Sequence, residues 1–171
     1  MAACRRVIRS CGLAIRSVHR RLPDAVVDHT AAAERDLRAA QAVLAPFPAV
    51  AHAGFLQDAE KEYAEAVLTA AMVAGEPLAD HVAIGVSIPA WLNGLAEAAS
   101  ELRRHALDRL RADDMASAER LLHTMDDVYD ALVAVDHPDA LTGGLRRTTD
   151  ALRAVLERTR GDVTLASIHR R

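Results

Sequence analysis

The sequence predicts an all-α protein, folded as an antiparallel multi-helix bundle. Of its 171 residues 51% are hydrophobic but only 3% are aromatic, and alanine and leucine dominate the apolar set. Alanine, leucine, arginine and glutamate are strong helix formers, whereas strands favour β-branched and aromatic residues. No stretch alternates polar and apolar residues for long enough to indicate a sheet. Prolines and glycines divide the chain into five or six long segments with short connections, which is typical of a helical bundle.

The first half of the chain predicts two long helices. One covers residues 6–45, passes or bends at Pro23, and ends at "APFPAV", because two prolines cannot both lie in a helix interior. The next covers residues 47–74 and ends at Gly75, since glycine is a common residue at helix C-termini. Residues 76–85 are expected to form a loop with one short helix.

The second half predicts three more helices. Ser87 is a candidate N-cap with Pro89 in the first turn, and this helix runs to about residue 112. Another helix covers residues 113–136. The last begins at residue 139 or 141 and continues to residue 160 or beyond, with a kink near "TGGLRR". The length is that of one domain with a sizeable core, so residues 1–171 are predicted to fold as a unit.

Charge and cysteine content narrow the class of protein. A net charge of −3 gives no global basic signature, so any contact with nucleic acid needs a local patch. The two cysteines, Cys4 and Cys11, match no metal motif, and we expect a reducing, cytoplasmic setting. No apolar run reaches the roughly 18 residues of a membrane span. The arginine-rich, acid-free N-terminus resembles an organelle transit peptide; the preferred interpretation is a flexible extension over residues 1–12 that leads into the first helix.

Two predicted helices each carry a pair of closely spaced acids. Glu62 and Glu65 lie at i,i+3 on the flank of an apolar face, and Glu97 and Glu101 lie at i,i+4 on the side opposite the apolar face of their helix. Like charges at these spacings destabilise an isolated helix by roughly 0.2–0.5 kcal/mol. Spacing alone favours solvated helix faces with arginine partners, but a hard cation such as Mg²⁺ would also accept these ligands.

Three stretches taken in order resemble the translin superfamily. They are "GFLQDAEKEYAEA", "WLNGLAEAASELRRHALDRLRADD" and "VLERTRGDVTLAS". The family patterns E-[YF]-x-E-A and Y-L-x-G-x-x-D-x-x-G-E-L-x-R correspond here to residues 62–66 and 91–104. "IRSVHR", residues 15–20, resembles the basic first-helix segment of the family, and the match is closest to the translin-associated factor X branch and its single-gene prokaryotic relatives.

The resemblance implies an all-helical, translin-type fold and a function. Active members of the family are Mg²⁺-dependent ribonucleases that act on single-stranded RNA and DNA inside hollow oligomers. It therefore implies a Mg²⁺-dependent endoribonuclease in a closed homo-oligomer of six to eight subunits, with Mn²⁺ as an alternative ion and single-stranded DNA as an alternative substrate. The implied metal ligands and catalytic residues are Glu62, Glu65, Glu97 and Glu101, the last directly or through water.

The substrate would need cations, and Arg can contact phosphate through two parallel hydrogen bonds. A cluster on the first helix has no acid near it until Asp24, and two arginines adjoin the acidic face of residues 97–101. The predicted nucleic-acid contacts are Arg16, His19, Arg20, Arg21, Arg103 and Arg104.

Three departures from the family pattern keep other functions open. Glu97 replaces the family's aspartate with a side chain one methylene longer, Ser100 replaces a glycine and Trp91 a tyrosine. The alternatives are a non-catalytic single-strand-binding protein of the same fold, and an unrelated helical scaffold or metal-stress protein with solvated acids. The eight histidines are scattered and form no zinc motif.

Overall fold

The computed structural model describes residues 1–169, and within them every regular element is a helix. Six helices have 19 or more residues, and two are single turns of four. The helices are α1 (Ala2–Arg20), α2 (Pro23–Leu44), α3 (Pro48–Ala51), α4 (Phe55–Ala74), α5 (Ile88–Arg111), α6 (Met115–Val133), α7 (Asp139–Thr142) and α8 (Leu145–His169). The predicted all-α bundle is therefore confirmed.

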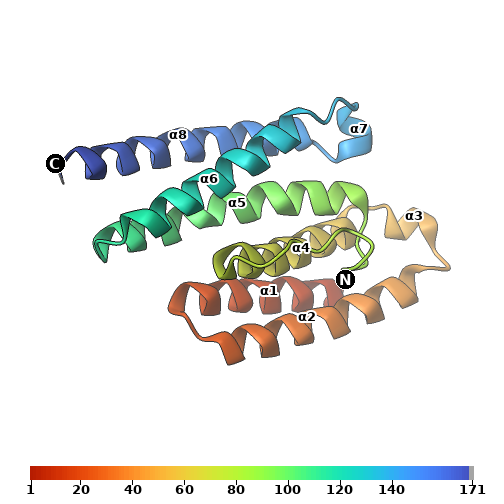
Figure 1. The fold of residues 1–171 in the computed structure, drawn as a ribbon. Helices are drawn as coiled ribbons and strands as arrows, with labels where there is room; N and C mark the ends of the chain where they lie inside the picture. The colour runs from red at the N-terminus through yellow and green to blue at the C-terminus, as the bar shows by residue number, and fades with distance from the viewer. Residues whose placement is uncertain (170–171) are drawn as a thin grey trace.

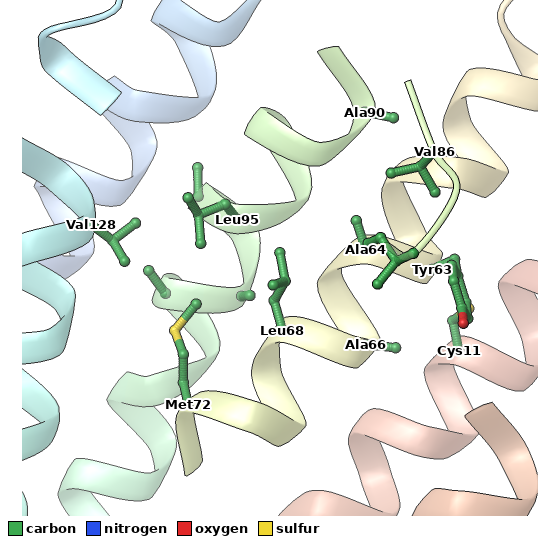
Figure 2. Packing of buried hydrophobic residues seen from close by; sticks show 14 of the residues in the cluster. Cys11, Tyr63, Ala64, Ala66, Leu68, Met72, Val86, Ala90, Leu95 and Val128 are labelled. Atoms are coloured by element: carbon green, nitrogen blue, oxygen red, sulfur yellow. The ribbon is translucent and has the colours of Figure 1, made fainter. Parts of the chain in front are cut away.

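The long helices form three layers (Figure 1). The α1–α2 hairpin packs on α4, α4 packs on α5, and α5 is covered on its other side by α6 and α8. One cluster of buried hydrophobic residues runs through all six long helices. Figure 2 shows Leu68 of α4, Leu95 of α5 and Val128 of α6 in this core, with Tyr63 and Cys11 on the α1 side. As a result, α4 and α5 are the central pair of the molecule.

The N-terminal region differs from the prediction in two ways. Residues 2–12 belong to α1 and bury Cys4, Val7 and Cys11 in the core, so they are not a flexible extension. The predicted helix over residues 6–45 is two antiparallel helices. Arg21 adopts the left-handed conformation (φ 57°) and Pro23 opens α2 at its first turn, because proline suits a helix start better than its interior.

Two further boundaries were predicted too simply. The helix expected over residues 47–74 is interrupted at Gly54, whose φ of 96° separates α3 from α4. Residues 76–80 have no regular structure and residues 81–85 form turns, so the short helix expected there is absent from this described loop. Ser87 occupies the N-cap of α5, but its side chain makes no capping hydrogen bond. Consecutive glycines, Gly143 and Gly144, have positive φ and separate α7 from α8.

Polar side chains of α2 and α4 hold the loop that leads into α5. Arg38 donates from Nη1 to the carbonyl of Gly85 at 2.8 Å and from Nη2 to that of Ile84 at 2.7 Å. The backbone N–H of Ser87 donates to Glu60 Oε2 at 3.0 Å. These contacts fix where α5 starts relative to α4.

None of the helices among residues 1–169 is both long and apolar enough to cross a membrane.

Candidate metal centre

The crossing of α4 and α5 depends on Gly94. A Cβ atom at this position would lie 2.7 Å from Ala64 Cβ, 2.8 Å from the carbonyl oxygen of Lys61 and 3.0 Å from the backbone nitrogen of Glu65. Two of these three neighbours are backbone atoms, which cannot rotate away. The absence of a side chain at Gly94 therefore lets the two backbones meet beside the acids of both helices.

This close approach brings together three of the predicted acids. One carboxylate oxygen from each of Glu62, Glu65 and Glu97 can be chosen so that all three oxygens lie within 4.8 Å of one another. The sequence predicts Glu97 on the side of its helix opposite the apolar face, and there it reaches α4: its carboxylate contacts Lys61 of α4, while its side chain stays 33% exposed. Carboxylate oxygens at this spacing suit a hard divalent cation.

Glu65 is the most enclosed of the three. Its residue is 9% exposed, and it makes no hydrogen bond or ion pair with another residue in the part of the chain that the structure describes. Burial raises the pKa of the Glu65 carboxyl to about 8, and the charges of Glu97, Glu62 and Glu101 add to the rise. The cluster thus holds more negative charge than its own surroundings neutralise.

Lys61 supplies the only cation in direct contact with this cluster among the described residues. Its Nζ lies 2.6 and 2.8 Å from the two carboxylate oxygens of Glu97 and 3.3 Å from Oε1 of Glu62. Partial burial acts to lower the pKa of Lys61, but the hydrogen bond and charge of Glu97, with Glu62, outweigh it and the pKa is raised. The ammonium group is therefore held in its charged form between two of the three acids.

Glu101, one turn beyond Glu97, has a different partner. His19 of α1 donates from Nε2 to Glu101 Oε2 at 2.7 Å, since an ionised carboxylate can only accept. The other ring nitrogen of His19 is hydrogen-bonded to His105 Nε2 at 3.0 Å, and the two rings stack with centroids 4.8 Å apart. Burial, with repulsion from His19, lowers the pKa of His105 to about 4. This chain of contacts ties α1 to α5.

The predicted nucleic-acid contacts separate into two groups. The His19 side chain is only 5% exposed and points to Glu101, and Arg103 pairs with Asp162 of α8 at 2.8 Å while donating to Thr159. The other four are exposed, and Arg16 also donates from Nε to the carbonyl of Gly12. The exposed group consists of Arg16, Arg20, Arg21 and Arg104.

A groove of about 190 Å³ adjoins the cluster on the side of α7 and α8. Lys61 and Glu97 line it, together with Arg147 of α8, which is exposed and has no ion pair to the described residues. Asn93 also lines it, donating to the carbonyl of Thr142 at 2.8 Å and accepting from Thr148 Oγ1 at 2.6 Å, so it holds the start of α8 against α5. A polar groove therefore lies between the start of α8 and Glu97, at the edge of the cluster.

Three residues important to the site were not predicted. Gly94 appears in the sequence only as one position of the family pattern over residues 91–104, Lys61 belongs to no predicted contact, and His105 is one of the scattered histidines. The close approach at Gly94 had one available signal, the G in the family pattern. The partners of Lys61 and His105 lie 36 and 86 residues away, so no local pattern could reveal them.

Comparison with solved structures identifies the family, although no family model matches the sequence. An uncharacterised protein of Methanocaldococcus jannaschii is 27% identical over 161 residues, which are 93% of this chain and 71% of the relative. A crystal structure of AfC3PO matches with a TM-score of 0.89 at 30% identity, covering 99% of this chain and 88% of the other.

Two further structures agree with this match. A complex of AfC3PO with duplex RNA has a TM-score of 0.88 at 30% identity, over 99% of this chain and 87% of the other. Apo-NeC3PO has a TM-score of 0.84 at 17% identity, over 96% and 88%, and so shows likeness of fold alone. Both are translin-superfamily proteins. With 30% identity to AfC3PO and one fold over nearly its whole length, this chain belongs to the translin superfamily.

Proposed function

We propose that this protein is a Mg²⁺-dependent endoribonuclease that cleaves RNA strands within a closed homo-oligomer. The observation that carries the proposal is the convergence of Glu62, Glu65 and Glu97 within 4.8 Å at the α4–α5 crossing. The donor set fits the ion, since all ligands are carboxylate oxygens and the most buried one has no protein partner among the described residues. Mn²⁺ accepts the same ligands and is an alternative.

The reaction requires water to add to phosphorus while the bond to one bridging oxygen breaks. A divalent ion supplies charge that stabilises the phosphoryl oxygens and orients the phosphate. Glu62, Glu65 and Glu97 would hold that ion from two helices. Glu65 or Glu101 would orient the attacking water through a carboxylate oxygen, and the His19 contact keeps Glu101 in place for this. The groove beside Glu97 would take part of the strand next to the cluster.

The proposed ligand is RNA, in a homo-oligomer of six to eight subunits. The support for RNA is the AfC3PO complex, which contains duplex RNA. The sequence-based expectation was single-stranded RNA or DNA, so both forms of RNA and single-stranded DNA belong in the test. Closed symmetry would allow a chain of this size to surround a strand that one subunit cannot enclose. Light scattering that shows a monomer would contradict the shell.

A second function has specific support. Glu97 stands where the family pattern has aspartate, and both of its oxygens contact the ammonium of Lys61. If that ion pair persists with substrate present, the protein would bind strands without cutting them. The same cleavage experiment separates the two functions.

The test is cleavage of short labelled RNA, single-stranded and duplex, with Mg²⁺ and with EDTA. Glu62→Gln removes one ligand charge, and Glu119→Gln, an exposed acid on α6, is the matched control. We expect cutting that requires Mg²⁺, is lost in Glu62→Gln and is retained in Glu119→Gln. Cutting that persists in a folded Glu62→Gln variant would refute the metal assignment. RNA binding without cutting would establish the second function.

A further inference from the structure

Lys61 is unusual in the sequence before any contact is considered. Of the 21 basic residues in the chain it is the only lysine, and the other 20 are arginines. At every other basic position in the chain the residue is arginine. Lysine differs from arginine in carrying a compact point charge on a flexible stem, without the planar fork that binds a carboxylate rigidly.

That single lysine lies at the carboxylate cluster. Its Nζ is within 2.8 Å of both oxygens of Glu97 and 3.3 Å from Glu62, so it contacts two of the three candidate metal ligands. The side chain is 25% exposed, which leaves it a route outward. An ammonium group in this position neutralises part of the charge that a divalent ion would otherwise neutralise.

We propose that Lys61 is a resident cation of the cluster, and that a divalent ion binds by displacing its ammonium group from Glu97 and Glu62. This inference rests on the proposed metal site. Both carboxylate oxygens of Glu97 now accept from Lys61, so an ion that Glu97 ligates must take an oxygen that the ammonium group occupies. Two cations a few ångströms apart also repel one another, so both cannot keep their contacts with Glu97. Below a threshold concentration of the ion, the ammonium group of Lys61 therefore keeps its contacts with Glu97 and Glu62.

The groove beside Glu97 is where the displaced ammonium would go. Lys61 already lines it, and so does Arg147, which has no ion pair to any described residue. The two cations would then line one polar groove next to the cluster. Such a pair suits the phosphate oxygens of a strand, so binding of the ion would prepare the groove for the strand's backbone.

The first test is calorimetric titration of the intact, nucleic-acid-free protein with Mn²⁺ alone. Lys61→Met removes the charge and keeps an unbranched stem, and Lys61→Arg keeps the charge. We expect Lys61→Met to bind Mn²⁺ at least about tenfold more tightly than wild type, and Lys61→Arg no more tightly than wild type. Equal or weaker binding by Lys61→Met overturns the inference.

The second test uses the wild-type chain, so it does not depend on any variant folding. Because Lys61 is the only lysine, a peptide-resolved mass measurement after brief treatment with an amine-reactive reagent reports its accessibility separately from the N-terminus. We expect Mn²⁺ to speed the labelling of Lys61 in wild type. In Glu62→Gln, which loses a ligand, the ion should have little effect. Unchanged labelling of wild type at saturating Mn²⁺ overturns the displacement.

These outcomes separate the inference from the proposed function. If Mn²⁺ binds wild type and Lys61→Met equally, and Glu62→Gln loses it, the metal site stands and the role of Lys61 fails. If Mn²⁺ binds none of the proteins, the proposed metal site fails and the inference fails with it.

Discussion

The two acids of α5 that were predicted as one pair, Glu97 and Glu101, lie in different surroundings. Glu97 faces α4 and is held by Lys61, whose positive charge is retained at all ordinary pH values. Glu101 faces α1 and is held by His19, which is in turn stacked on His105. The Lys61 side joins three carboxylates that repel one another, whereas the His19 side is a chain of paired groups.

This difference shows that spacing on one helix does not define a site. Residues four apart share a face, but the helix opposite decides what each one meets. At Glu97 the neighbouring helix brings two more acids, and at Glu101 it brings a ring that donates a hydrogen bond. The first arrangement favours a metal ion, and the second favours a fixed carboxylate.

The largest effect on stability should come from Glu65→Gln, measured in EDTA, because it removes one of the three negative charges of Glu62, Glu65 and Glu97. The pKa of Glu65 is about 8 in the folded chain and about 4.5 in the unfolded one, with Glu62, Glu97, Glu101 and Lys61 around it. Between these values the folded chain binds the extra proton, so wild-type stability falls relative to the variant as pH rises from about 4.5 to about 8. Above that range we expect the variant to be more stable by up to roughly 5 kcal/mol.

Urea unfolding of both proteins from pH 5 to pH 9 measures this difference. Glu101→Gln is the comparison, because it removes an acid that already has a partner; it should lower stability instead of raising it. A Glu65→Gln variant whose stability runs parallel to wild type at every pH would show that Glu65 carries no unrelieved charge.

The next effect should come from Gly94→Ala, which pushes α4 and α5 apart. Overpacking costs about 1–3 kcal/mol and alanine's helix propensity returns up to ~1 kcal/mol, so a net loss of about 1–2 kcal/mol is expected from the two together. Mn²⁺ affinity should fall as well, because Glu97 would move away from Glu62 and Glu65. Gly12→Ala is the matched control, since nothing lies within 4 Å of a Cβ added there. Denaturant titration and calorimetry check both effects; equal behaviour of the two variants would contradict the role of Gly94.

A smaller effect is expected from His19→Gln on the other side. Loss of the stacked ring and a weaker hydrogen bond to Glu101 should cost about 1 kcal/mol of stability. Mn²⁺ affinity should stay at the wild-type value, in contrast to Lys61→Met, because His19 does not contact the three-acid cluster. A large change in Mn²⁺ affinity would mean that the two sides act as one site.

The smallest effect is expected at the surface. Arg20→Gln should weaken RNA binding by roughly 0.2–1 kcal/mol, as for an exposed ionic contact, and should reduce the dependence of binding on salt. His19→Gln should leave binding unchanged, since that side chain is turned inward. Arg158→Gln, an exposed arginine on α8, is the control. If filter binding gives the same loss for Arg20 and Arg158, the end of α1 is not the contact surface.

Much of the fold could be predicted because its determinants are local. Pro89 lies in the first turn of α5 and Gly75 is the C-cap of α4, as predicted from their residue types. The long helices α5 and α6 lie close to their predicted ranges. The errors also have local causes that composition does not resolve. Pro23 is compatible with a bend or with a new start, and only the left-handed Arg21 selects the second.

Part of the candidate site could be predicted from the sequence. The resemblance to the translin superfamily singled out Glu62, Glu65 and Glu97, whereas periodicity alone assigned Glu97 to solvent. Periodicity identifies one buried face per helix, but α5 is enclosed by α4 on one side and by α6 and α8 on the other. The contacts of Lys61 and His105 depend on that enclosure, so they became visible only with the helices assembled.

The Gly94 crossing has a consequence for the order in which the molecule is made. Glu62 and Glu65 come from the half of the chain that ends with α4, and Glu97 and Glu101 from the half that begins with α5. During synthesis the first half therefore carries two acids and a lysine but no cluster. The cluster comes into being only when the later half docks, so a truncated or half-folded chain contains no such centre.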